Sequence, residues 1–363
     1  MARDEPRLTS SASAIPLPWQ VQAQRMALAL VIGAAGGFLF RRLTMPLPWM
    51  LGSMSFVTVA TLAGLKTRIP SGFRSVMIGV LGIMLGGQFT ATIVARMGEW
   101  TFTITALAIW MLLSGSIGLF YFRKYAGYDK TTAFFSATPG GLNEMMMVGG
   151  SMGGDVRIIS LTHASRIVLV AFTIPLWYRL SGAVPAVTPG AGIGMLDLAW
   201  QDVLILAGCG IVGAFGARAL RVPAAFLVGP MVLSAIVHVS GLTTSKPPDA
   251  LVAFAQVVIG ASVGARFGGM AVSRIAKIAG HALVTGVAML ALTVIFSLTL
   301  SRFTGYPLHA VVLAFAPGGL AEMSLIALAL SLDAAFVASH HIARIVMVVT
   351  IAPLIYRLTH KRG

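Results

Sequence analysis

The stretch "ATPGGLNEMMM", residues 137–147, decides how this chain can fold. It lies inside an apolar segment, near 131–152, yet it contains a proline, two glycines and a glutamate. Proline removes a backbone hydrogen-bond donor and glycine permits unusual dihedral angles, so a regular helix is not expected here. Broken backbone at membrane depth persists only where protein buries it or water lines it. The stretch therefore predicts a broken or re-entrant element inside a membrane protein.

Composition agrees with a membrane location for the whole chain. Of its 363 residues, 57% are hydrophobic and only 10% are charged, and the mean hydropathy is +0.88. A soluble domain carries about a quarter charged residues, and apolar runs of roughly 20 residues, which recur here, are the length that a spanning helix needs. The net charge of +15 does not indicate nucleic-acid binding, because Lys and Arg are scattered between the apolar runs. We expect an all-α polytopic membrane protein that does not bind nucleic acid directly.

The opening pattern returns as "FAPGGLAEMSL", residues 315–325, and the chain aligns with itself at an offset of 177 to 178 residues. A common offset across so many polar and glycine positions is not expected from apolar composition alone, so the chain is a duplication. Matched pairs include Gly33 and Gly210, Pro46 and Pro223, Gly82 and Gly260, Pro139 and Pro317, Glu144 and Glu322, His163 and His341, and Arg166 and Arg344.

The duplication divides the chain into five parts. Each half contains six apolar segments, and the fifth of each carries the Pro-Gly-Gly motif. Glycines, prolines and two aspartates mark the join between the halves. We predict a polar N-terminal tail over 1–24, a first membrane repeat over 25–180, a linker over 181–202, a second repeat over 203–358 and a C-terminal tail over 359–363.

The distribution of Lys and Arg favours an inverted arrangement of the halves. If all twelve segments crossed, 15 of these residues would lie inside and 9 outside. If both Pro-Gly-Gly segments re-enter, each half crosses five times, and the counts become 18 and 6, with Arg166 and Arg344 within helices. The positive-inside rule prefers the second arrangement with a cytoplasmic N-terminus. The predicted fold is therefore two inverted repeats of five crossings plus one broken or re-entrant element each, which gives 10–12 membrane segments.

Glu144 and Glu322 are the two acidic residues that lie well inside apolar segments. An intramembrane carboxylate is costly and indicates a functional site, and here both occupy the same repeat position beside a backbone break. Broken segments expose carbonyls and helix ends that bind ions or small solutes. The alternative is a kinked helix with a structural, hydrogen-bonded or protonated glutamate.

The helix after each motif carries an aspartate, a histidine and an arginine on one side. Asp155 and Asp333 fit helix N-caps. His163 and Arg166 lie one turn apart and deep in the span, as do their equivalents. Two interpretations stay open: Arg166 pairs with Glu144, and Arg344 with Glu322, as structural bridges, or a ligand or proton exchanges with these groups while histidine titrates.

The candidate site for a substrate or ion combines the two motifs with these helices. Asn143 has an alanine as its repeat equivalent, so the halves differ there. No spacing supplies three converging metal ligands, so we predict no metal, no cofactor and no catalytic residue. The candidate residues are Pro139, Gly140, Gly141, Asn143, Glu144, His163, Arg166, Pro317, Gly318, Gly319, Glu322, His341 and Arg344.

With the duplicated "PGGLNEM" and "PGGLAEM" and the following Asp–His–Arg helix, the chain resembles the membrane AbrB-like family, over roughly residues 27–358. That family consists of two AbrB-type duplication domains. "MPLPWMLG", residues 45–52, also resembles the family, with Phe226 in place of tryptophan in the second copy. The resemblance implies a regulator of gene expression or an ammonia monooxygenase, and no metal-ligand pattern supports the second label.

Three functions remain at this point. A secondary transporter or permease for an unidentified small solute is favoured, with the paired Pro-Gly-Gly and glutamate elements at its centre. A membrane sensor or regulator without transport is the alternative, and a membrane oxidase is disfavoured. We expect a multi-pass protein of a bacterial inner (plasma) membrane whose partners are the bilayer and the solute, with a homodimer as one compatible assembly.

Overall fold

The computed structural model describes residues 18–182, 194 and 198–360, and this part of the chain is helical with no strand. Seven of its helices are long and apolar enough to cross a membrane, and α2, α3, α10 and α14 are shorter apolar helices. The predicted all-α polytopic class is confirmed. The elements are α1 (Trp19–Arg42), α2 (Pro48–Leu62), α3 (Ser71–Gly86), α4 (Ala91–Arg96), η1 (Met97–Trp100), α5 (Thr101–Lys124), α6 (Lys130–Ala137), α7 (Leu142–Ser151), α8 (Val156–Leu180), α9 (Trp200–Ala219), α10 (Ala225–Val239), α11 (Asp249–Gly264), η2 (Ala265–Phe267), α12 (Val272–Thr304), α13 (Leu308–Phe315), α14 (Leu320–Ala329) and α15 (Ala334–His360).

Two helices begin earlier than the sequence boundaries suggest. α1 starts at Trp19, within the predicted tail, directly after the extended residue Pro18. α9 starts at Trp200, within the predicted linker. Asp202 is a first-turn residue of α9, where a carboxylate interacts favourably with the helix dipole. It also accepts hydrogen bonds from the Thr243 and Ser245 hydroxyls. An aspartate that resembles a loop residue in sequence therefore belongs to a helix start.

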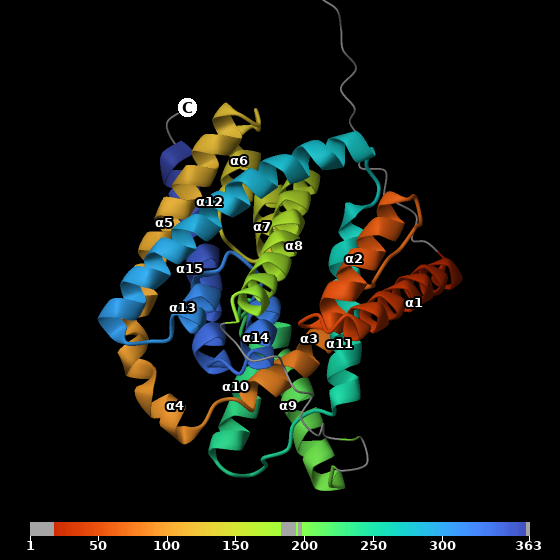
Figure 1. The fold of residues 1–363 in the computed structure, drawn as a ribbon, viewed down its shortest axis with the longest axis vertical. Helices are drawn as coiled ribbons and strands as arrows, with labels where there is room; N and C mark the ends of the chain where they lie inside the picture. Colours follow the sequence, from red (N-terminus) through yellow and green to blue (C-terminus); the bar gives the residue numbers. More distant parts are fainter. Residues whose placement is uncertain (1–17, 183–193, 195–197, 361–363) are drawn as a thin grey trace, which may run out of the picture.

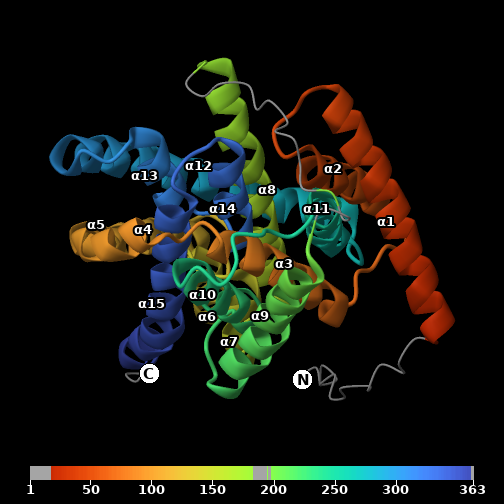
Figure 2. The ribbon, with the colours of Figure 1, turned by 90° about the horizontal axis from the view of Figure 1, so that it is seen from below.

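The helices form two groups, and each group mixes the repeats. In the first group α2 packs on α11, α3 packs on α10, α1 and α9 lie outside these pairs, and α3 touches α11. The second group contains α5–α8 and α12–α15, in which α12 packs on α8 and α5. Figure 1 shows α1, α2 and α11 on one side of α8 and α5 and α13 on the other, with α12 crossing α8, and Figure 2 shows α1 and α2 apart from α5 and α13 from below. Neither half of the chain therefore folds as a separate body.

Close helix crossings in the first group depend on glycine. A Cβ placed on Gly82 of α3 would lie 2.5 Å from the carbonyl oxygen of Leu227 and 3.2 Å from Cβ of Pro230, both in α10. The repeat equivalent, Gly260 of α11, approaches the carbonyl oxygen of Met50 in α2 in the same way. Without a hydrophobic driving force between helices in lipid, such close backbone contact is a main source of stability.

Each Pro-Gly-Gly motif lies at the tip of a helical hairpin. The backbone N–H of Asp155, just before α8, donates to Oγ1 of Thr132 in the first turn of α6, at 2.8 Å. In the second half Tyr306, just before α13, stacks on Phe336 near the start of α15 with ring centroids 4.8 Å apart. The chain therefore leaves each broken element at the end where it entered, and α7 and α14 return alongside α6 and α13.

The two hairpins open toward opposite ends of the molecule. The Tyr178 hydroxyl near the end of α8 donates to the carbonyl oxygen of His309 in the first turn of α13, at 2.9 Å. Symmetrically, the Tyr356 hydroxyl near the end of α15 hydrogen-bonds to Thr131 in the first turn of α6. α8 and α15 therefore run antiparallel, and each ends where the other repeat's hairpin begins (Figure 1).

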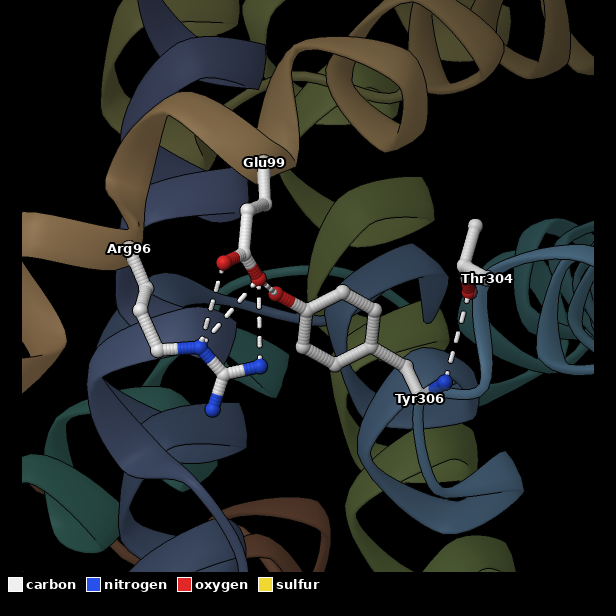
Figure 3. A network of polar contacts seen from close by, with 4 residues as sticks. All are labelled: Arg96, Glu99, Thr304 and Tyr306. Carbon is white, nitrogen blue, oxygen red and sulfur yellow. Dashed lines mark hydrogen bonds and ion pairs between the residues drawn. The ribbon is translucent and has the colours of Figure 1, made fainter.

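A polar cluster holds the mouth of the second hairpin (Figure 3). The guanidinium of Arg96 pairs with the Glu99 carboxylate at 3.1 Å, and the Tyr306 hydroxyl donates to the same carboxylate at 3.4 Å. The Tyr306 N–H donates to Oγ1 of Thr304. Because the Arg96 and Glu99 side chains are more than half exposed, their ion pair contributes little stability. The cluster serves to position the loop that leads into α13.

Alanine at Gly82 should destabilise the protein, because the new methyl group would overlap the α10 backbone. Overpacking of this kind costs about 1–3 kcal/mol. Gly216→Ala is the matched control, since nothing lies within 4 Å of a Cβ at that α9 position, and alanine favours a helix by up to about 1 kcal/mol over glycine. Thermal unfolding in detergent should show a lower Tm for G82A and an equal or higher Tm for G216A, and equal Tm values would contradict the crossing.

Candidate functional site

The first hairpin breaks where the sequence predicts it. Thr138 ends α6 in an extended conformation, as a residue before proline prefers, and Pro139 brings no N–H. Gly141 is also extended and caps α7. In the second hairpin Ala316 and Gly319 adopt the matching conformations. Backbone groups at both tips are thus released from helical hydrogen bonds.

The glutamate of each motif folds back over the second glycine. A Cβ on Gly141 would overlap an oxygen of the Glu144 carboxylate, and the same holds for Gly319 and Glu322. Both carboxylates lie in the first turn of α7 and α14, where the helix dipole favours negative charge. Glu322 is buried and Glu144 is half-buried. The second glycine is therefore required by the position of the carboxylate.

A histidine and an arginine from the following helix support each break. Nε2 of His163 hydrogen-bonds to the carbonyl oxygen of Phe135 at 2.9 Å, and its Nδ1 faces Nη2 of Arg166 at 2.8 Å. His341 makes the equivalent contacts with Leu313 and Arg344. A carbonyl only accepts and a guanidinium only donates, so each imidazole is the neutral tautomer with its proton on Nε2. This arrangement opposes protonation, because a proton on Nδ1 would face the arginine.

The two arginines differ in their other contacts. Arg344 donates to the carbonyl oxygens of Ala316 and Gly318, which the second break releases. Arg166 instead directs Nη1 to the sulfur of Met289 in α12, at 3.9 Å. Both side chains are almost fully buried. The second hairpin tip is therefore fixed by charge-assisted hydrogen bonds that the first lacks.

Of the two interpretations that the sequence leaves open, the one in which Arg166 pairs with Glu144 and Arg344 with Glu322 is wrong. The other, in which a ligand or proton exchanges with these groups, stays a prediction. In the part of the chain that the structure describes, the ion pairs within 4.0 Å join Arg96 to Glu99 and Arg274 to Asp155. The glutamates remain over their own helix starts, while Arg344 is bound by the break carbonyls. The N-cap prediction is confirmed: Asp155 accepts from the first N–H groups of α8, and Asp333 from the N–H of Phe336.

The hairpin tips lie close to the other half of the molecule. A Cβ on Gly140 would lie 2.7 Å from a methyl carbon of Val348 in α15, so the first tip meets the second repeat. The guanidinium of Arg74, in the first turn of α3, is within electrostatic range of both Glu322 and Glu144. The thirteen predicted residues therefore lie in two tips and two helices that surround one region.

Two arginines of this region were not among the predicted site residues. Nη2 of Arg266, in η2, donates to Oδ1 of Asn143 at 3.0 Å. Nε of Arg74 donates to Oγ of Ser262, in α11, at 3.0 Å. By sequence both resemble loop charges at helix ends. The alignment of the two repeats could have singled them out, because it pairs each arginine with an uncharged residue: Arg266 with Gln88 and Arg74 with Val252.

Arg344→Gln should destabilise the protein more than Arg166→Gln. The first change leaves two buried carbonyls without their donor, at about 1–3 kcal/mol each, whereas Arg166 donates to no carbonyl. Tm in detergent measures the effect, with Arg157→Gln in the exposed first turn of α8 as the control. Equal losses at 166 and 344 would show that the carbonyl contacts do not stabilise the break.

Comparisons with known proteins show which family the chain resembles. The family model described as "Transition state regulatory protein AbrB" matches residues 49–360. The "Uncharacterized protein YhjN" of Bacillus subtilis (strain 168) is 27% identical over 357 residues, which covers 91% of this chain and 92% of that protein. The "Putative regulator AbrB" of Escherichia coli (strain K12) is 25% identical over 341 residues, covering 92% of this chain and 94% of that protein. Since the family model spans most of the chain, the protein is a member of the AbrB family.

Proposed function

We propose that the protein is a secondary transporter for a small solute, which binds between the two hairpin tips. The observation that carries the proposal is the pair of broken hairpins that open toward opposite ends and bring Glu144 and Glu322 within range of one arginine, Arg74. Broken helices that meet inside the protein from two sides place polar backbone and carboxylates where a solute can be bound away from lipid.

The hairpins would enter a bacterial plasma membrane from opposite faces, with the N-terminus in the cytoplasm. Three observations support this orientation: the excess of Lys and Arg on one side, the antiparallel α8 and α15, and the opposite openings of the hairpins. In this orientation the first hairpin is reached from the cytoplasm and the second from outside. A solute bound at the tips would lie between the two openings.

The two helix groups suggest how access would alternate. α3 of the first group touches α14 and α15 of the second, η2 touches α8, and the contact of Arg266 with Asn143 joins η2 to α7. Rocking of one group against the other around a fixed site is how repeat-built transporters expose a solute to each side in turn. The interleaved packing of α2 on α11 and of α3 on α10 would keep the first group rigid during this motion.

A regulator without transport is the second candidate, and it is favoured by the printed names of the family and of the Escherichia coli relative. An effect on gene expression would also follow from transport, if the solute level is sensed elsewhere. Counterflow in proteoliposomes separates the two. Vesicles preloaded with unlabelled solutes from a panel of acids, amines and neutral compounds should accumulate at least one labelled counterpart; a sensor would accumulate none.

Glu144→Gln and Glu322→Gln should each abolish the pH dependence of uptake, if a proton moves with the solute through these carboxylates. Uptake into proteoliposomes with and without a pH gradient measures the effect. Glu99→Gln, an exposed carboxylate in η1, is the control and should retain the dependence. Unchanged pH dependence in both site variants would reject proton coupling through this pair.

Single cysteines at the hairpin exits should report opposite faces of the membrane. Ser151, at the end of α7, and Ser331, just after α14, are both exposed. In a Cys209→Ser background, a membrane-impermeant thiol reagent added to intact cells should label S331C but not S151C. After permeabilisation, both should react. Labelling of both, or of neither, in intact cells would contradict the inverted orientation.

A further inference from the structure

Arg74 and Arg266 form a pair of cations with neutral partners, and they come from different repeats. Arg74 contacts Ser262, and Arg266 contacts Asn143 and, more loosely, Ser160 and the sulfur of Met146. Neither guanidinium has a carboxylate within 4.0 Å among the described residues. Both side chains are half-buried, so solvent and solutes reach them more readily than Arg166 or Arg344.

Arg74 contacts Ser262, which lies one helical turn before Arg266 along α11 and η2, so the two guanidiniums belong to the same small region. Placing like charges together in a partly buried position is unfavourable unless an anion offsets them. The carboxylates of Glu144 and Glu322 lie within range of Arg74 but remain folded over Gly141 and Gly319. Together with the buried Arg166 and Arg344, the region contains four guanidiniums and two carboxylates, so it carries more cationic than anionic groups.

The repeat comparison shows that the fold does not need this pair. The equivalent of Arg74 is Val252, that of Arg266 is Gln88, and that of Asn143 is Ala321. The second hairpin forms with the uncharged Ala321 in the first turn of α14. A cluster that is present on one side of a duplicated fold and replaced on the other is better explained by a ligand than by structural need.

We propose that Arg74 and Arg266 bind an oxyanion, a carboxylate or phosphate group, with the Asn143 amide as a third donor. Resting on the transport function proposed above, this makes the cargo a small anionic solute. A guanidinium presents paired N–H donors that match the two oxygens of such a group. Oδ1 of Asn143 accepts from Arg266 at 3.0 Å, which leaves the amide N–H₂ free to donate to the anion.

Equilibrium binding to the purified full-length protein in detergent tests the site. The probes are citrate, inorganic phosphate and phosphatidylglycerol, each added at constant ionic strength, and Tm is the readout. Citrate or phosphate should raise Tm in a saturable manner. Arg74→Val, Arg266→Gln and Asn143→Ala each introduce the residue that the other repeat carries, so the variants should fold, and each arginine variant should raise the apparent Kd by about tenfold or more.

Arg157→Gln, on the exposed first turn of α8, is the control and should bind as the unmodified protein does. A rise with phosphatidylglycerol alone would identify a lipid headgroup and overturn the cargo assignment. If no probe raises Tm in a way that depends on Arg74 and Arg266, the site itself is refuted. The binding measurement needs no gradient across a membrane, so it is independent of the counterflow test. A failure to bind these anions would leave transport of another solute testable by counterflow, and a failure of counterflow would not change the binding result.

Discussion

Every backbone N–H and C=O group inside this molecule must find a partner, because neither lipid nor an apolar core supplies one. Pro-Gly-Gly releases carbonyls at the tips of the two hairpins, and neighbouring side chains supply hydrogen bonds there. The histidine and arginine of the next helix reach back to the hairpin, and the glutamate folds over its own helix start. In the second hairpin a buried arginine thus supports the break, whereas the first hairpin breaks without such a contact from Arg166.

The two halves share one arrangement of hairpin and supporting helix, but the contacts of the two hairpin tips differ. In the second half Arg344 fixes the hairpin tip through two carbonyls, whereas Arg166 leaves the first tip free of that constraint. The first tip instead faces Arg266 across the boundary between the helix groups. One hairpin is therefore anchored within its own group, while the other is joined to the opposing group through side chains.

The helical class and the position of both breaks could be predicted from the sequence, because Pro-Gly-Gly and intramembrane glutamate are strong local signals. The partners of the buried arginines and glutamates could not be predicted from the sequence. Arg166 and Glu144 have opposite charges and lie on adjacent segments, but Arg166 contacts His163 and Met289 while Glu144 stays over its own helix start. These alternative partners come together only in the folded molecule. Arg74 and Arg266 were not included in the candidate site for a related reason: they lie at helix ends, where arginine usually faces lipid headgroups. Only the folded structure shows Arg266 on Asn143 of the first hairpin and Arg74 on Ser262 of α11.

The exchange of helices between the repeats has a consequence for biosynthesis. α2 packs on α11 and α3 on α10, so the glycine face of α3, with Gly82 and Gly86, has no partner until the ribosome has produced the second repeat. Until then, this face of α3 must contact lipid or an insertion factor instead of α10. Tyr178 and Tyr356, which each join one repeat to the hairpin of the other, form their bonds only late in assembly. Truncation after the first repeat would therefore leave an unfinished molecule rather than half of a working one.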